Sequence, residues 1–118
     1  MIVEDEKDLC FLLELILKKE NLNTTSVNSI LEAKQSIKNI EPKVLFVDNH
    51  LPDGSGTDFI GQVRLSYPTI KIIMITAYDT PLDIQKAFNN GVDYFISKPF
   101  NASAIKNVLA RFALGNTG

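Results

Sequence analysis

Acidic side chains stand at the ends of two apolar segments of this sequence. Glu4 and Asp5 follow the short apolar start of the chain, and Asp48 ends the run VLFV before a loop that contains Pro and Gly. If these carboxylates meet in space, each close pair repels by roughly 4 kcal/mol at an effective dielectric constant of about 20. They then need a cation, or one of them must take up a proton. A cluster of oxygen ligands suits Mg²⁺ rather than zinc.

A lysine and a threonine stand at the ends of two further apolar segments. Lys98 directly follows the run YFIS, and Thr76 ends the run IKIIMIT. A Mg²⁺ ion and an ammonium group around one carboxylate are what phosphoryl transfer requires, because its catalysis consists mainly of positioning and of neutralising charge on the phosphoryl oxygens. The Thr76 hydroxyl can donate to one of those oxygens. The pattern therefore indicates a phosphoryl-transfer site centred on Asp48.

Taken singly, each of these residues has a simpler explanation. An acid pair after a strand often does no more than complement the dipole of the following helix. Asp48 alone fits a turn residue, Lys98 alone a solvated surface lysine, and Thr76 alone a good strand former. The joint placement favours a shared site, because four separate segments each end in a complementary group.

The order of apolar segments predicts how these groups are brought together. Short apolar runs alternate with segments of helical periodicity, which is typical of βα units. Five strands are expected, at residues 1–4, 23–27, 43–47, 70–76 and 94–97. Two of the runs are nearly continuous, as in a parallel sheet with helices on both faces. These features predict a (βα)5 doubly wound, flavodoxin-like α/β fold of strand order 2-1-3-4-5, in which Glu4, Asp5 and Asp48 meet beside strands 1 and 3.

Helix faces and helix ends are also visible. Two apolar stripes of helical spacing are predicted, one of Leu9, Leu12, Leu13, Ile16 and Leu17, the other of Ile105, Val108, Leu109 and Phe112. Ser29 with Glu32 matches a capping box. Thr80 with Pro81 and Asp83 matches a cap followed by proline, and Asn90 with Gly91 a helix stop.

Length and composition limit the function classes. The 118 residues, 45% hydrophobic and 22% charged, are typical of one globular domain; we expect it at residues 1–114, with residues 115–118 as a tail or the start of a linker. The net charge of −2 gives no electrostatic reason for direct nucleic-acid binding. Cys10 is the single cysteine, and no apolar stretch approaches the ~20 residues that span a bilayer. We expect a cytoplasmic domain without membrane contact, and we interpret Met1 as an internal strand residue of a trimmed fragment.

Four motifs together resemble the receiver domain of two-component response regulators, over essentially the whole chain. They are VEDE, VDNHLPDGSG with Pro four and Gly eight residues after the acid, TAY, and GVDYFISKPF. The resemblance implies that Asp48 accepts a phosphoryl group from a sensor histidine kinase or phosphotransfer protein in a phosphorelay. It also implies a signalling domain that catalyses only its own phosphorylation and dephosphorylation.

The resemblance further implies roles for the neighbouring residues. Asp5 would ligate Mg²⁺ directly, together with Asp48 and the backbone carbonyl of His50, while Glu4 would act mostly through a bound water. Glu4 stands where the family often has an aspartate, and the polar pair Asn49 and His50 follows the acceptor.

The resemblance also implies a conformational switch that responds to phosphorylation. Lys98 would pair with the phosphoryl group, and Thr76 would donate a hydrogen bond to it. Phe95 occupies the place of the switch aromatic, although a permanently buried core aromatic fits equally well. Phosphorylation would change the surface of the fourth helix, fifth strand and fifth helix, through which a homodimer is possible. Pro99 is where the family often has a cis peptide bond.

We hypothesise that His50 and Tyr78 shield the aspartyl phosphate from water and slow its hydrolysis.

Other interpretations of the sequence fit less well. A dehalogenase-like phosphohydrolase needs a second acid two residues after the nucleophile, where this chain has His50. A flavin- or nucleotide-binding module needs a glycine- or hydroxyl-rich loop after the first strand, where EDEKD would repel phosphate. A domain that only docks has no need of the Asp48, Lys98 and Thr76 set. The sequence leaves open whether the domain stands alone, precedes a DNA-binding output domain or belongs to a hybrid kinase.

Overall fold

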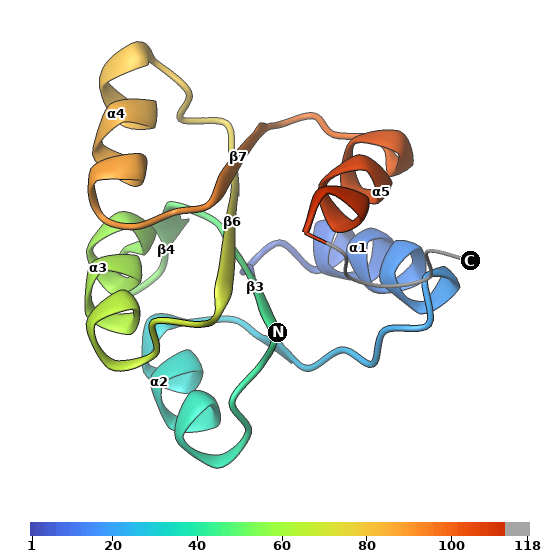
Figure 1. Cartoon of the computed structure of the whole chain (residues 1–118), viewed down its shortest axis with the longest axis horizontal. Helices are drawn as coiled ribbons and strands as arrows, with labels where there is room; N and C mark the ends of the chain where they lie inside the picture. The colour runs from blue at the N-terminus through green and yellow to red at the C-terminus, as the bar shows by residue number, and fades with distance from the viewer. Residues whose placement is uncertain (113–118) are drawn as a thin grey trace.

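A computed structural model describes residues 1–112 as a central parallel sheet between two layers of helices (Figure 1). The strand order β2-β1-β3-β6-β7 confirms the predicted flavodoxin-like order 2-1-3-4-5. The strands are β1 (Ile2–Val3), β2 (Ser26–Val27), β3 (Val44–Val47), β6 (Lys71–Thr76) and β7 (Tyr94–Ser97). β2 is shorter than expected because its one neighbour, β1, offers only Ile2 and Val3 for pairing. The predicted domain end at residue 114 lies outside the described residues.

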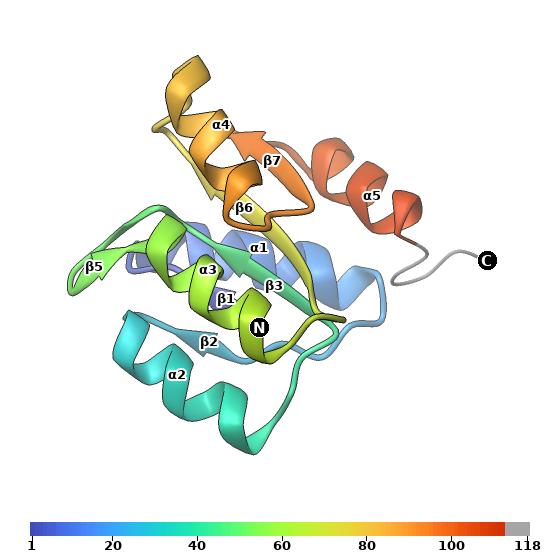
Figure 2. The same cartoon turned by 60° about the vertical axis from the view of Figure 1, so that its left-hand side comes forward.

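The helices divide between the two faces of the sheet. α1 (Lys7–Lys19) and α5 (Ala102–Arg111) cover one face, and α2 (Ile30–Asn39), α3 (Gly56–Ser66) and α4 (Pro81–Asn89) cover the other (Figures 1 and 2). Within β3, Val44 and Phe46 contact the α1/α5 core, whereas Leu45 and Val47 contact the α2/α3/α4 core. This two-sided burial explains why the run VLFV is continuous.

The predicted helix faces and ends are largely confirmed. Ile105, Val108 and Leu109 are buried. The stripe on α1 is wrong at one position, since Leu12 is 42% exposed and Cys10 is buried instead. Spacings of three and four from Cys10 through Leu13 to Leu17 keep one narrow face on the sheet, and Leu12 falls outside it.

The predicted caps form, with one difference. Thr80 and Asp83 make a full capping box. The Ser29 hydroxyl oxygen accepts the N–H of Glu32, but among the described residues the Ser29 N–H donates no bond to the Glu32 carboxylate, so the box there is incomplete. α4 ends before Asn90.

A short hairpin follows β3 and was not predicted. It consists of β4 (His50–Leu51), labelled in Figure 1, and β5 (Gly54–Ser55), labelled in Figure 2, which pair antiparallel. Strands of two residues leave no alternation of apolar and polar residues in the sequence. The hairpin turns the chain back toward α3, whose first residue, Gly56, passes against the end of β3. A Cβ on Gly56 would lie 2.1 Å from the carbonyl oxygen of Asp48, so this close approach requires glycine.

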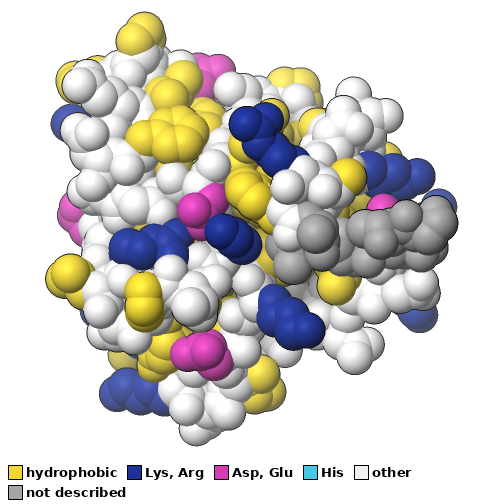
Figure 3. All heavy atoms as spheres, in the orientation of Figure 1, with side chains coloured by type: hydrophobic (Ala, Val, Ile, Leu, Met, Phe, Trp, Pro, Cys, Tyr) yellow, Lys and Arg dark blue, Asp and Glu magenta, His cyan; other side chains and the backbone are white. Residues whose placement is uncertain are grey.

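Large exposed hydrophobic side chains occur on and beside α4. Tyr78, Leu82 and Phe88 are each about half exposed, and the space-filling view shows hydrophobic side chains gathered over this helix (Figure 3). In α4 only Ala87 is buried. Within residues 1–112, no helix combines the length and the apolar character needed to cross a membrane.

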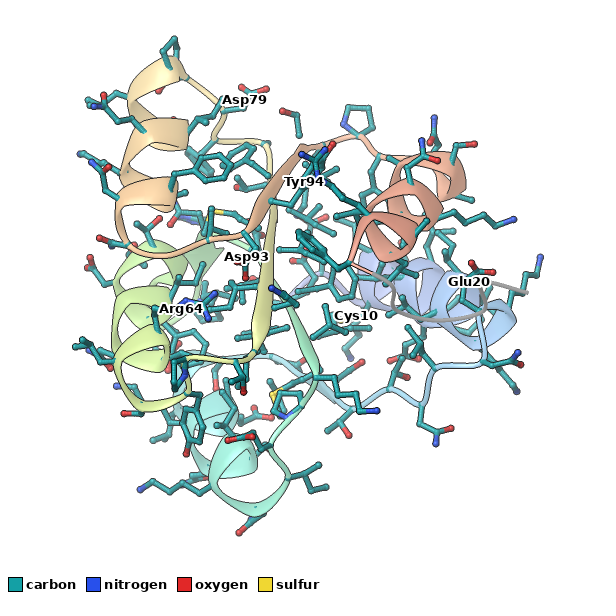
Figure 4. All side chains as sticks on the ribbon, viewed as in Figure 1. Cys10, Glu20, Arg64, Asp79, Asp93 and Tyr94 are labelled. Carbon is teal, nitrogen blue, oxygen red and sulfur yellow. The ribbon has the colours of Figure 1, made fainter. Side chains whose placement is uncertain are left out.

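Arg64 connects α3 to the segments that lead into β6 and β7. Its guanidinium donates to the carbonyls of Gly91, Pro68 and Ile70 at 2.8 to 3.1 Å and forms an ion pair of 2.7 Å with Asp93 (Figure 4). Such a multidentate arrangement requires the planar fork of arginine.

Candidate functional site

The carboxyl ends of the central strands enclose a crevice of about 320 Å³. Loops after β1, β3, β6 and β7 contribute its walls, as expected at the switch point of a doubly wound sheet. The lining residues are Asp5, Glu6, Asp48, His50, Thr76, Ala77, Tyr78 and Lys98. All predicted site residues except Glu4 and Phe95 therefore line one crevice, and Glu4 reaches it through Lys98.

The ammonium group of Lys98 is the centre of the site. Its Nζ lies 2.8 Å from Oε1 of Glu4, 3.1 Å from Oδ2 of Asp48 and 3.6 Å from Oε1 of Glu6. The Lys98 side chain is 11% exposed, and the carboxylates of Glu4 and Asp48 are buried. Lys98 thus supplies a positive charge to the acidic cluster. A phosphoryl group bound to Asp48 would compete with the carboxylates of Glu4 and Asp48 for the Lys98 ammonium.

Burial shifts the protonation of the groups around Lys98. It raises the pKa of Glu4 to about 7, against the opposing hydrogen bond from Lys98, and the charge of Asp48 adds to the rise. Burial also disfavours the charged form of Lys98, but the hydrogen bond to Glu4 and the charges of Asp48 and Glu4 outweigh it, so the pKa of Lys98 is raised. Glu4 is therefore a carboxylate that can take up a proton near neutral pH in the metal-free site.

This shift predicts a pH-dependent stability in the metal-free protein. Because the pKa of Glu4 is raised from 4.5 to about 7 on folding, its contribution to stability is complete below pH 4.5 and is lost as the pH rises through about 7. Glu4→Gln, which mimics the protonated carboxyl, should therefore gain stability relative to the unmodified chain over that range. Urea unfolding in a chelator at several pH values measures the difference, and parallel stability curves would contradict the prediction.

Three carboxylates are arranged as a possible metal site. Oxygen atoms of Glu4, Glu6 and Asp48 all lie within 4.8 Å of one another. Hard cations such as Mg²⁺ prefer these ligands, so the residues fit the predicted ion. Glu6 was not predicted, because its approach to Glu4 depends on the bend at Asp5, which no local sequence pattern indicates. Asp5 lines the crevice but is outside this group, and its role as a direct ligand stays a prediction.

Thr76 and the aromatic side chains complete the crevice. Thr76 is fully buried, and its hydroxyl oxygen accepts the backbone N–H of Tyr78 at 3.2 Å. The rings of His50 and Tyr78 lie 5.4 Å apart between centroids. The His50 N–H donates to Oδ1 of Asp48 at 3.3 Å. The two rings therefore lie next to each other in the wall of the crevice that contains Asp48.

Phe95 does not line the crevice. It is partly buried and packs against the α2/α3/α4 core, so both interpretations of this residue stay open. The peptide bond between Lys98 and Pro99 is cis, as predicted.

Known proteins share this sequence pattern. The family model described as the response regulator receiver domain matches residues 1–110. The response regulator protein PilR of Pseudomonas aeruginosa is 31% identical over 110 residues, which cover 93% of this chain and 25% of PilR. The sensory transduction protein RegX3 of Mycolicibacterium smegmatis is 32% identical over 117 residues, which cover 96% of this chain and 51% of RegX3. The chain thus spans a quarter to a half of these relatives, whose whole-protein activities do not follow from the match.

Solved structures share the fold. A CheY-like response regulator receiver domain protein from Methanospirillum hungatei has a TM-score of 0.89 and 25% identity, covering 94% of this chain and 89% of that one. The beryllofluoride-activated NtrC4 receiver domain dimer has a TM-score of 0.88 and 27% identity, covering 93% and 91%. The similarity therefore extends over almost the whole length of isolated receiver domains.

Proposed function

Because the chain belongs to the response regulator receiver domain family of two-component signal transduction, we propose that Asp48 accepts a phosphoryl group from a sensor histidine kinase or phosphotransfer protein. The observation that carries this proposal is the Lys98 ammonium, on a side chain only 11% exposed, between the buried carboxylates of Glu4 and Asp48. A lone surface lysine or turn aspartate has no need of such an arrangement. The same acidic group supports a Mg²⁺ requirement.

The reaction assigns a step to each of these side chains. An oxygen of the Asp48 carboxylate forms a bond to phosphorus as the bond to the donor's histidine nitrogen breaks, and that nitrogen keeps the electron pair. Lys98 then neutralises a phosphoryl oxygen, and the Thr76 hydroxyl donates to another. A Mg²⁺ ion held by the acidic residues would supply further neutralisation of the transferred charge. The domain acts only on itself in this scheme.

Mass spectrometry of the intact domain tests the proposal. Incubation with Mg²⁺ and a small-molecule phosphodonor should produce a single phosphoryl adduct, and prior chelation of the metal should prevent it. If the domain instead hydrolyses the donor continuously without retaining an adduct, a phosphohydrolase of the dehalogenase-like class becomes the better assignment.

The signal leaves the site through the α4/β7/α5 surface in this proposal. A phosphoryl group adds about −1.5 to −2 of charge, so Thr76 and Lys98 must move toward it. Phe95, three residues before Lys98 on β7, then changes its packing and biases two conformations of that surface. The exposed side chains of Leu82 and Phe88 on α4 support a docking role. The dimeric NtrC4 receiver makes a homodimer of this chain a reasonable proposal.

The rings of His50 and Tyr78 lead us to expect a long-lived phosphoryl group on Asp48. His50 and Tyr78 both line the crevice that contains Asp48, with their rings 5.4 Å apart, so removal of both rings should expose the phosphoryl group to water and shorten its lifetime severalfold. The double change His50→Gly, Tyr78→Gly tests this, with loss of the adduct followed over time. Tyr78→Phe, which keeps the ring, serves as the control and should retain a near-normal lifetime. An unchanged lifetime in the double variant would refute the hypothesis.

A further inference from the structure

The hairpin β4–β5 determines where the backbone of His50 lies. His50 is paired with Ser55 in the hairpin, and Leu51 with Gly54. The carbonyl of His50 is the one metal ligand of the proposed function that comes from the backbone, so it cannot adjust by rotating a side chain. Its position depends on how the hairpin is attached at its base and at its tip.

The base of the hairpin is attached to α3. The side-chain oxygen of Asn49 accepts the N–H of Thr57 at 3.0 Å, the Thr57 hydroxyl at 2.7 Å and the Ser55 hydroxyl at 3.2 Å. The Asn49 carbonyl accepts the N–H of Gly56 at 2.8 Å. These bonds fix the residue between Asp48 and His50 against the start of α3.

The tip of the hairpin is attached to α2 by Asp53. Its two carboxylate oxygens accept the N–H of Ile30 at 2.8 Å and of Leu31 at 3.0 Å. These are the first two amides of α2, which have no partner within the helix, and they hold the pKa of Asp53 below its usual value. A Cβ on Gly54, the next residue, would lie 3.1 Å from the Ile30 side chain, so the tip also packs closely on α2.

We propose that Asp53 is a positioning residue for the metal site: by tying the hairpin tip to the N-terminus of α2, it holds the His50 carbonyl where the ion is bound. This inference rests on the proposed function. Asp53 bonds two adjacent amides at once, which fixes its direction as well as its distance. Groups that orient a metal ligand without touching the ion typically change metal affinity by about 10- to 100-fold when removed.

Titration of Mg²⁺ into the metal-free domain, followed by calorimetry, tests the inference. Asp53→Ala should weaken Mg²⁺ binding by about tenfold. Asp53→Asn, which keeps one acceptor oxygen, should have an intermediate affinity. The matched control is Asp58→Ala, which removes an exposed acid from the first turn of α3. Among the described residues the Asp58 side chain accepts no hydrogen bond, so this variant should bind Mg²⁺ within about twofold of the unmodified chain.

A second measurement separates positioning from simple helix capping. Urea unfolding in a chelator measures only what the Asp53 cap contributes to the stability of the fold, because no metal is bound. Amide hydrogen exchange at His50 measures the mobility of the hairpin base. Asp53→Ala should increase exchange at His50 as well as at Ile30. If Asp53→Ala reduces stability but leaves the Mg²⁺ affinity unchanged, the inference is overturned, and Asp53 only caps α2. If Asp58→Ala weakens Mg²⁺ binding as much as Asp53→Ala does, the inference is also overturned, because the loss of a distant negative charge would then explain both effects. Failure of the unmodified domain to bind Mg²⁺ would instead refute the proposed function.

Discussion

Asp48→Asn is expected to abolish the phosphoryl adduct completely while the domain stays folded. The amide nitrogen and oxygen of asparagine are poor nucleophiles toward phosphorus, and no other lining carboxylate has the same contact with the backbone N–H of His50 and the ammonium of Lys98. Mass spectrometry with Mg²⁺ and a small phosphodonor measures the result. We therefore expect Asp48, and no other described residue of the crevice, to carry the adduct.

The same variant should not lose stability in the absence of metal. The charge of Asp48 contributes to the raised pKa of Glu4, so its removal relieves a buried repulsion while Lys98 keeps its ion pair with Glu4 at 2.8 Å. Urea unfolding in a chelator is the matching measurement. Asp58→Asn, outside the crevice, is the control and should retain the adduct. An adduct that persists in Asp48→Asn would show that another residue is the acceptor.

Gly56→Ala is expected to destabilise the fold by about 3 kcal/mol or more. The added methyl group would lie 2.1 Å from the carbonyl oxygen of Asp48 and 2.9 Å from the Cα of Asn49. Both neighbours are backbone atoms, so no side-chain rotation relieves the overlap, and α3 must move away from β3. The melting temperature should fall by roughly 10 °C or more.

Gly61→Ala provides a matched control in the same helix. A Cβ there would make only ordinary contacts, the nearest to Asn90 at 3.7 Å. Because alanine favours a helix interior over glycine by roughly 0.5–1 kcal/mol, this variant should be slightly stabilised. Thermal unfolding compares the two substitutions directly, and equal melting temperatures would contradict the proposed close approach at Gly56.

The strand order could be predicted because buried parallel strands are continuous apolar runs, and VLFV and IKIIMIT are visible as such. The predicted ends of the strands were less accurate. The extent of β2 depends on how many residues its neighbour offers for pairing, which no local pattern contains. The hairpin β4–β5 was missed for a related reason, since its residues show no periodicity.

The meeting of Asp48 with Lys98 could be predicted from topology, because both residues directly follow parallel strands of one sheet. The contributions of Glu6, Asp53 and Arg64 could not. Glu6 depends on the extended conformation of the chain just before α1. Asp53 and Arg64 bond backbone groups more than 20 residues away in sequence, and a backbone amide or carbonyl carries no sign of its partner in the sequence.

The sheet order also gives Asp48 and Lys98 unequal support from neighbouring strands. Asp48 follows β3, the middle strand, which is hydrogen-bonded on both sides, whereas Lys98 follows β7, the outermost strand, which is bonded only to β6. A displacement of β7 disturbs one ladder, while a displacement of β3 disturbs two. If Asp48 accepts the phosphoryl group as proposed, we expect β3 to keep its place and any shift of Lys98 to be accommodated by β7, at the edge of the sheet.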